Sequence, residues 1–148
     1  MEEFSYSKLA LIFARDIMTD IVATVKPDIN IGQIAHKMLT ERVSGYPVVD
    51  DENNLVGIVT LRDLFILLDQ IARESSVSLQ ENITRTKTMA LNTIMSRQVH
   101  TVTPDTSLDE IIRDVVNSHI HTFPVVQDGK LVGIIGRHDI LNAVFVYG

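Results

Sequence analysis

The stretch that decides the fold runs from residue 47 to residue 63 and reads Pro47-Val48-Val49-Asp50-Asp51-Glu52-Asn53-Asn54-Leu55-Val56-Gly57-Ile58-Val59-Thr60-Leu61-Arg62-Asp63. Two apolar runs flank a polar turn, and the second run ends in a threonine with a carboxylate three residues later. This pattern predicts a β-hairpin whose second strand leads into a helix. The order returns as Pro124-Val125-Val126, Leu131-Val132-Gly133-Ile134 and Asp139. The chain therefore carries a duplicated hairpin-and-helix unit.

The duplication extends upstream of both hairpins. Ile17-Met18, Val22, Thr24-Val25 and Pro27-Asp28 recur 77 residues later as Ile94-Met95, Val99, Thr101-Val102 and Pro104-Asp105. In each copy the segments Val22–Val25 and Val99–Val102 are expected to be extended, because proline disfavours helix in the residue before it. Capping boxes at Asn30–Gln33 and Ser107–Glu110 then predict helices with one apolar face.

Each copy therefore has the order β-α-β-β-α and belongs to a mixed α and β (α+β) fold class. We place repeat 1 at residues 14–73, a linker with room for a short helical turn at 74–90, and repeat 2 at 91–148. A unit of this size buries too little surface to be stable alone. The two repeats are expected to pack sheet to sheet about a pseudo-twofold axis, which would leave two related clefts.

The bulk composition restricts the class of protein. The 148 residues carry a formal net charge of −6, no cysteine, and 45% hydrophobic residues. A net acidic chain is a poor partner for nucleic acid or an anionic membrane. The apolar runs fall far short of a membrane span and no signal peptide is visible, so we expect a soluble, cytoplasmic protein. Arg85, Lys87 and Arg97 form a local basic stretch that is either an ordinary solvated segment or faces an anionic ligand or partner.

The segment from Thr60 to Asp63 is the strongest candidate for a binding site. Backbone N–H groups at a helix start suit an anion, Thr60 adds a hydroxyl, and Arg62 could add a charged contact. Asp63 can accept the two hydroxyl hydrogen bonds of a ribose diol. The same residues also make a good helix cap that needs no ligand, and the sequence leaves both readings open.

The second copy of this motif has lost its hydroxyl. It reads Gly136-Arg137-His138-Asp139, so the carboxylate remains and Arg137 and His138 are possible phosphate partners. We therefore expect the cleft of repeat 1 to bind a nucleotide more tightly than the cleft of repeat 2.

The repeated order and the Gly-x-x-Thr-x-x-Asp motif resemble tandem cystathionine β-synthase (CBS) domains, also called a Bateman module. The resemblance covers residues 14–148 and leaves no room for an attached enzyme, which implies a stand-alone pair. It implies a regulatory module that binds AMP, ADP, ATP or S-adenosylmethionine in the clefts between the repeats. In the pattern of that family, the Thr and Asp of the motif hold phosphate and ribose. Backbone of the first strand and of the residues before Pro-Val-Val contacts adenine. Mapped onto this chain, the implied positions are Val22, Ala23, Ser44, Gly45, Tyr46, Pro47, Thr60 and Asp63 in repeat 1, and Val99, His100, His121, Thr122, Phe123, Pro124 and Asp139 in repeat 2.

Other functions find less support in the residues. His119 and His121 are the closest histidine pair, but no third metal ligand is evident nearby, so we expect no metal site. No nucleophilic triad motif is present, and we expect no catalytic residues and no catalytic cofactor. The rival to a ligand sensor is a ligand-independent interaction module that regulates or scaffolds a partner protein.

The helices that follow Thr60 and Gly136 carry more apolar residues than one core-facing stripe requires. A homodimer that covers the surplus is the interpretation we prefer. The alternative is that the N-terminal segment Phe4–Phe13 covers Ile66 or Phe145 within the same chain.

Overall fold

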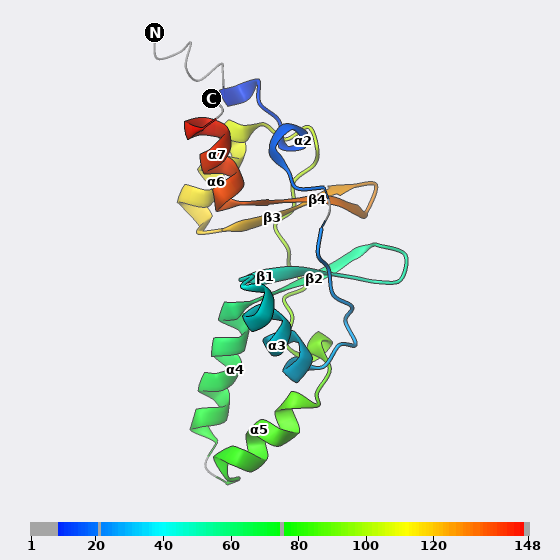
Figure 1. Cartoon of the computed structure of the whole chain (residues 1–148), viewed down its shortest axis with the longest axis vertical. Coiled ribbons are helices and arrows are strands. Elements are labelled where there is room, and N and C mark those ends of the chain that lie inside the picture. The colour runs from blue at the N-terminus through cyan, green and yellow to red at the C-terminus, as the bar shows by residue number, and fades with distance from the viewer. Residues whose placement is uncertain (1–8, 21, 75, 147–148) are drawn as a thin grey trace. The chain divides into compact units, whose positions relative to one another are not determined.

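The computed structural model describes residues 9–20, 22–74 and 76–146 (Figure 1). The expected mixed α and β class is confirmed, with the β-structure arranged as two separate antiparallel hairpins. The elements, in chain order, are α2 (Ala14–Ile17), α3 (Ile31–Glu41), β1 (Gly45–Val49), β2 (Leu55–Thr60), α4 (Leu61–Arg73), α5 (Leu79–Lys87), the 3-10 turn η1 (Leu91–Thr93), α6 (Leu108–Ser118), β3 (Thr122–Gln127), β4 (Lys130–Gly136) and α7 (Arg137–Phe145). The two predicted hairpins and the helices after them are present where the sequence placed them.

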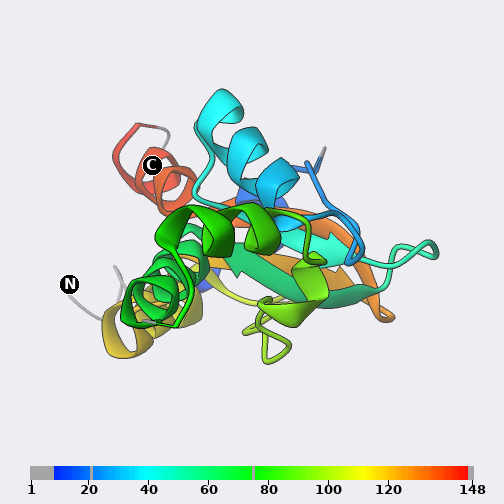
Figure 2. The ribbon, with the colours of Figure 1, turned by 90° about the horizontal axis from the view of Figure 1, so that it is seen from below.

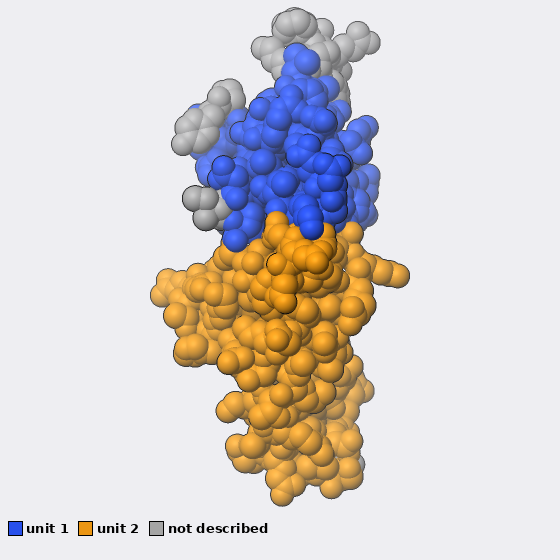
Figure 3. Space-filling model, turned by 90° about the vertical axis from the view of Figure 1, so that its right-hand side faces the viewer, with its two compact units in different colours: residues 1–22, 100–148 blue, residues 23–99 orange. Residues whose placement is uncertain are grey.

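The chain divides into two compact units, and their boundaries do not follow the sequence repeats (Figure 3). Unit 2 contains residues 23–99, and unit 1 combines the chain up to residue 22 with residues 100–148. Each repeat therefore contributes its opening segment to the unit that holds the hairpin of the other repeat. The spatial units therefore differ from the sequence repeats in one segment, the opening segment of each repeat.

Unit 2 is built on the β1–β2 hairpin, in which Gly45 pairs with Thr60. Upstream, Val25 lies beside β1 in parallel, as an isolated bridge to Val48 rather than as a full strand. Helices α3, α4 and α5 lie on one face of the hairpin (Figures 1 and 2). The core between them is aliphatic apart from one tyrosine and consists of Val25, Ile34, Met38, Tyr46, Val48, Val59, Leu91 and Met95.

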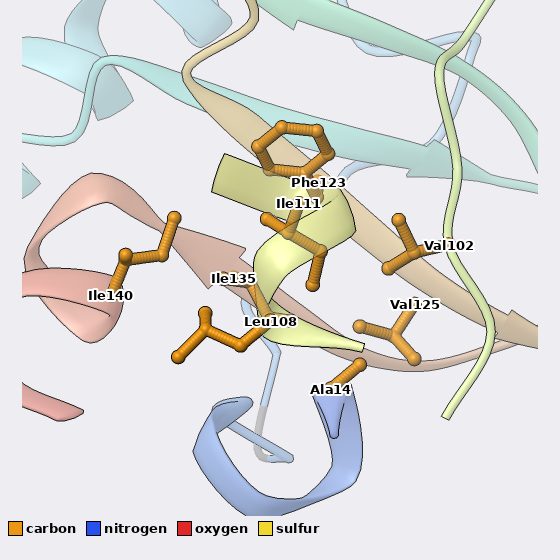
Figure 4. Close-up of a cluster of buried hydrophobic side chains, with 8 residues drawn as sticks. All are labelled: Ala14, Val102, Leu108, Ile111, Phe123, Val125, Ile135 and Ile140. Atoms are coloured by element: carbon orange, nitrogen blue, oxygen red, sulfur yellow. The ribbon is translucent and has the colours of Figure 1, made fainter. Parts of the chain in front are cut away.

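Unit 1 repeats this plan around the β3–β4 hairpin, in which Thr122 pairs with Gly136. Val102 forms the matching parallel bridge to Val125. The hairpin turn at Asp128-Gly129 has positive φ at both residues (54° and 80°), as a tight primed turn requires. Figure 4 shows the core, which consists of Ala14, Val102, Leu108, Ile111, Phe123, Val125, Ile135 and Ile140.

One of the two predicted capping boxes forms and the other does not. At the start of α3, Gln33 N donates to Asn30 Oδ1 (2.8 Å) and Asn30 N donates to Gln33 Oε1 (3.1 Å). At the start of α6, Ser107 is the N-cap residue but its side chain makes no capping bond. The Ser107 side chain lies close enough to the Asp109 carboxyl to lower its pKa.

Helix α5 (Leu79–Lys87) occupies nine residues of the segment that the sequence predicts to be a linker with room for a short helical turn. Ser78 caps it by accepting from Glu81 N at 3.2 Å. The helix packs against α3 and α4, and the residues it buries are Asn82 and Thr86. Because its buried face is polar, the segment lacks the apolar periodicity that identifies a helix in sequence.

Candidate functional site

The Thr60–Asp63 segment spans the junction at which β2 ends and α4 begins. Thr60 N donates to Asp63 Oδ2 at 2.7 Å, and the Thr60 hydroxyl donates to the same oxygen at 3.2 Å. Among the described residues Asp63 Oδ1 has no hydrogen-bond partner and Asp63 forms no salt bridge. One carboxylate oxygen thus stabilises the helix start while the other stays available to a hydroxyl donor. Arg62 is exposed and lies next to this pair.

The start of β1 lies directly beside Thr60. Leu61 N donates to the carbonyl of Ser44 at 2.9 Å, and Gly45 pairs with Thr60 across the hairpin. A Cβ on Gly45 would lie 3.1 Å from the Val59 carbonyl oxygen and 3.3 Å from Thr60 Cγ2. Glycine is therefore the residue that permits this close approach of β1 to Thr60.

The buried side chain of Tyr46 links the start of β1 to α3. Its ring is fully buried, its hydroxyl hydrogen-bonds the Glu41 carboxylate, and Lys37 Nζ lies 5.4 Å from the ring centroid. Burial, and then the bond to Glu41, raise the pKa of the Tyr46 phenol. Hydrogen bonds from Lys37 and Tyr46 lower the pKa of Glu41. The side chain of Tyr46 is thus structural, which leaves its backbone as the part that a ligand could contact.

The upstream segment of the predicted site is placed by a parallel bridge. Val25 N donates to the Pro47 carbonyl at 3.1 Å, so the exposed Ala23 lies two residues from a point fixed against β1. Val22 is the last residue that groups with unit 1, and Ala23 is the first of unit 2. Within unit 2 the structure therefore brings together Ala23, Ser44, Gly45, Tyr46, Pro47, Thr60, Arg62 and Asp63, which we call the Thr60 site.

The equivalent segment in unit 1 keeps the carboxylate geometry. Gly136 N donates to Asp139 Oδ2 at 2.7 Å, which matches the bond between Thr60 and Asp63. Thr122 pairs with Gly136, and the exposed His121 precedes it. Val102 N donates to the Pro124 carbonyl at 3.0 Å.

His100 takes the position that Ala23 has in the first repeat. His100 Nε2 lies 2.9 Å from Asp114 Oδ2, and its ring meets Phe123 edge-on with centroids 5.7 Å apart. This pair ties the segment before Val102 to α6. Val99, one residue upstream, groups with unit 2. Unit 1 thus holds His100, His121, Thr122, Phe123, Pro124, Arg137, His138 and Asp139, which we call the Asp139 site.

Arg137 and Asp139 open into different grooves of unit 1. Arg137 lines an apolar groove of about 360 Å³ between α6 and α7, together with Ile112, Val115, Val116, Ile140, Leu141, Val144 and Phe145. Asp139 lines a second groove of about 390 Å³, together with Ile12, Asp16, Ile17, Asn142 and Ala143. Arg137, a candidate phosphate partner by sequence, therefore does not share the groove of the carboxylate. His138 is exposed and is not among the residues that line either groove.

Sequence reasoning missed three polar residues that the structure places beside the predicted ones. Asp16 and Asn142 line the groove of Asp139, and Asp114 holds His100. None of the three belongs to the repeated landmarks. Asp16 immediately precedes the Ile17-Met18 opening, and it shares a unit with Asp139 because the two repeats exchange their opening segments.

Metal binding and membrane insertion find no support in the described residues. No group of three or more His, Cys, Asp or Glu side chains among them could hold a metal ion. Within the same part of the chain, no helix has the length and apolar character needed to cross a bilayer.

Comparison with known proteins shows the same duplication. The family model of the CBS domain matches twice, at residues 14–69 and 91–146. The uncharacterised protein MJ1225 of Methanocaldococcus jannaschii is 32% identical over 129 residues, which cover 86% of this chain but 41% of that protein.

Solved structures agree with this match. The structure of MJ1225 matches with a TM-score of 0.82 and 26% identity over 95% of this chain and 51% of that one. CBSX2 of Arabidopsis thaliana, solved in complex with AMP, gives a TM-score of 0.74 and 29% identity over 89% of this chain and 95% of that one. The CBS domain pair of MJ0100, solved with 5-methylthioadenosine and S-adenosyl-L-methionine, gives a TM-score of 0.71 and 26% identity over 88% of this chain and 94% of that one. This chain, with two copies of the domain, belongs to the CBS domain family.

Proposed function

We propose that this chain is a regulatory module that binds an adenosine-containing ligand, of the class of AMP, ADP, ATP or S-adenosylmethionine, and performs no catalysis of its own. The observation that carries the proposal is that only one of the two carboxylate oxygens of Asp63 is hydrogen-bonded among the described residues. One oxygen caps α4 and the other has no partner among the described residues, beside the backbone of Gly45, which pairs with Thr60. Similar CBS pairs crystallised with AMP or with S-adenosyl-L-methionine support the class of ligand.

The Thr60 site is the stronger nucleotide site of the two. It has an exposed guanidinium at Arg62 and a hydroxyl at Thr60, which donates to Asp63 in the ligand-free chain and would donate to a bound phosphate instead. The Asp139 site has Gly136 at the first position and its arginine in another groove. A carboxylate that accepts both hydroxyls of a ribose needs no change in the α4 cap, because the capping oxygen and the free oxygen are different atoms.

A thermal-shift screen followed by calorimetry tests the proposal. AMP, ADP, ATP and S-adenosylmethionine are titrated into the wild-type chain, and a ligand that binds the native state raises its apparent stability. Asp63→Ala should weaken binding by about 1–3 kcal/mol, because it removes a charged acceptor from the ribose. Asp69→Ala is the matched control: it removes a carboxylate from the same helix, where Asp69 pairs with Arg73. Absence of binding by all four ligands, or equal affinity in Asp63→Ala, would contradict the proposal.

A second proposal concerns assembly, and it rests on the outer faces of α4 and α7. Phe65 is 66% exposed and Leu68 is 51% exposed on α4, and Phe145 is 79% exposed on α7. Large exposed apolar patches on a globular protein mark interaction surfaces. We propose that a second copy of the chain covers these faces in a homodimer.

The alternative to a homodimer is that the N-terminal segment, residues 4–13, covers these faces, and the structure describes part of that segment. Ile66 and Phe145 stay 44% and 79% exposed, so the described part of the N-terminal segment, residues 9–13, does not cover them. Phe4, at the start of that segment, lies outside the described residues. A regulated partner protein that uses the same faces is the interaction-module alternative, and light scattering separates it from the homodimer.

A further inference from the structure

The groove between α6 and α7 is an apolar surface of unit 1 that the described residues leave open. Its apolar lining consists of Ile112, Val115 and Val116 from α6 and of Ile140, Leu141, Val144 and Phe145 from α7. Val116 is 69% exposed and Phe145 is more exposed still. The volume of about 360 Å³ is large enough to hold side chains of another segment.

Arg137 is the one charged residue among those that line this groove. It forms no salt bridge with any residue that the structure describes. It is also the first residue of α7, where a positive charge is unfavourable next to the helix dipole. The chemistry of the groove therefore suits an occupant that combines apolar side chains with a carboxylate able to pair with Arg137.

The first eight residues of the chain have this composition. They read Met1-Glu2-Glu3-Phe4-Ser5-Tyr6-Ser7-Lys8 and lie outside the described residues. Glu2 and Glu3 supply carboxylates, and Phe4 and Tyr6 supply aromatic side chains. The acidic and aromatic groups are adjacent in the segment, just as the cation and the apolar lining are adjacent in the groove.

The described chain begins on the core that underlies the groove. Leu9, its first residue, packs against the hydrophobic cluster of unit 1, as do Ile112 and Val144 of the groove lining. Glu3 lies six residues before Leu9, a distance that an extended chain spans with about 20 Å. Arg137 and Val144 lie seven residues apart on α7, which is about 10 Å along the helix. The segment is therefore long enough to bring Glu3 to Arg137.

We propose that residues 1–8 bind in the groove between α6 and α7 of the same chain, with Phe4 on the apolar lining and Glu3 paired with Arg137. The covalent tether gives the segment a high effective concentration, so a weak contact suffices to populate the bound state. The groove shares Phe145 with the proposed homodimer face, so the segment competes with the second copy for α7. Only this competition rests on the proposed homodimer.

A tryptophan at position 4 reports on the segment, because the chain contains no tryptophan of its own. Phe4→Trp is introduced into the full chain together with Phe65→Glu, which disfavours the homodimer at α4, and emission is recorded at nanomolar concentration. Leu11→Trp in the same background is the reference for an exposed indole, because Leu11 is 71% exposed. The indole of Phe4→Trp should emit at a shorter wavelength. Acrylamide should quench it about twofold less, as for a segment bound half of the time.

Substitutions in the groove should release the segment. Val116→Glu places a charge in the lining at an exposed position, so the chain should stay folded while the indole becomes as accessible as the reference. Asn117→Glu adds the same charge at an exposed position of α6 outside the lining and should change nothing. Arg137→Glu should also release the indole, and adding Glu3→Lys should restore its protection, because the reversed pair attracts again.

Three outcomes would overturn the binding of the segment. An indole in Phe4→Trp as accessible as the reference would show that the segment is free. Protection that survives both Val116→Glu and Arg137→Glu would place the segment outside the groove. Protection found only at concentrations at which light scattering detects a dimer would assign the groove to the second copy. Release by Val116→Glu but not by Arg137→Glu would overturn the ion pair with Glu3.

The competition with the homodimer has a test of its own. In the wild-type background, Glu3→Gln should lower the dissociation constant of the dimer by up to about fourfold, the limit when the groove of each copy is half occupied. Asp20→Asn removes the same charge from an exposed residue outside the groove and is the control. Equal constants for Glu3→Gln and Asp20→Asn would overturn the competition. A wild-type chain that is monomeric at every concentration would contradict the homodimer and leave the binding of the segment in place.

Discussion

Met18 packs directly on Gly133. A Cβ on Gly133 would lie 2.5 Å from Met18 Sδ and 2.9 Å from Met18 Cγ. The other copy repeats the contact, since a Cβ on Gly57 would lie 2.9 Å from Met95 Sδ. The methionine of each Ile-Met opening therefore packs on the hairpin glycine of the other repeat. These two contacts show directly that the repeats exchange their opening segments.

Replacing these glycines with alanine should destabilise the fold. In Gly57→Ala the new methyl group would also meet the Ser96 carbonyl oxygen at 2.8 Å, and that oxygen accepts a hydrogen bond from Ile58 N. We expect a loss of about 1–3 kcal/mol in the free energy of unfolding, as for other overpacked sites. Gly133→Ala should cost less, because the obstructing atoms belong to the flexible Met18 side chain.

Urea unfolding of the ligand-free chain measures both changes. Gly136→Ser is the control, because a Cβ at Gly136 would have Asp139 Oδ2 at 3.7 Å as its nearest neighbour, which is an ordinary contact. Wild-type stability in Gly57→Ala would show that the opening segment of repeat 2 does not pack on β2 as described.

The sequence predicts each repeat well but not which copy each opening segment joins. Ile17-Met18 and Ile94-Met95 have the same apolar character, so either could pack on Gly57 or on Gly133 without a change in pattern. Helix α5 escapes prediction because Asn82 and Thr86 form its buried face. Of the candidate site, Thr60 and Asp63 follow from the strand-to-helix motif, whereas Asp16 comes near Asp139 through tertiary contacts that no local pattern encodes.

Gly136→Thr should strengthen the Asp139 site for nucleotides. The backbone of Gly136 is extended (φ −104°, ψ 172°), which threonine adopts readily, and the open space around it accepts a side chain. The restored hydroxyl should raise the affinity for AMP by about 0.5–1.5 kcal/mol, the usual net contribution of one hydrogen bond.

Calorimetry with AMP in the Asp63→Ala background isolates this effect. Gly136→Val, which fills the same space without a hydroxyl, is the matched control and should give no gain. If wild-type chain binds AMP at the Asp139 site and not at the Thr60 site, our ranking of the two sites is wrong.

Tyr46→Phe should reduce stability at neutral pH and flatten its dependence on alkaline pH. Phe123 occupies the matching buried position of unit 1, so phenylalanine fits this kind of core. The loss is then confined to the hydrogen bonds of the hydroxyl, chiefly the one to Glu41 and also the longer one to the Lys37 carbonyl. The pKa of Tyr46 is raised in the folded state from its ordinary value of 10.0. Its contribution is therefore fully present below pH 10 and decreases as the pH rises above that value.

Unfolding free energies of both proteins at pH 8 and at successively higher pH values provide the measurement. The difference between wild type and Tyr46→Phe should shrink above about pH 10, the pKa of an unfolded tyrosine. A difference that stays constant through this range would mean that the Tyr46 hydroxyl is not held by Glu41 in solution.

The homodimer should depend on the outer faces of α4 and α7. Phe65→Glu and Phe145→Glu each place a charge on a face where the phenylalanine is 66% or 79% exposed in the single chain. Because these side chains pack little within the chain, the variants should remain folded while a dimer that buries them dissociates. Light scattering at micromolar concentration should give a dimer mass for the wild type and a monomer mass for both variants. Gln70→Glu adds the same charge at a polar exposed position of α4 and should stay dimeric. A monomeric wild type would instead leave these faces to a partner protein or to the N-terminal segment.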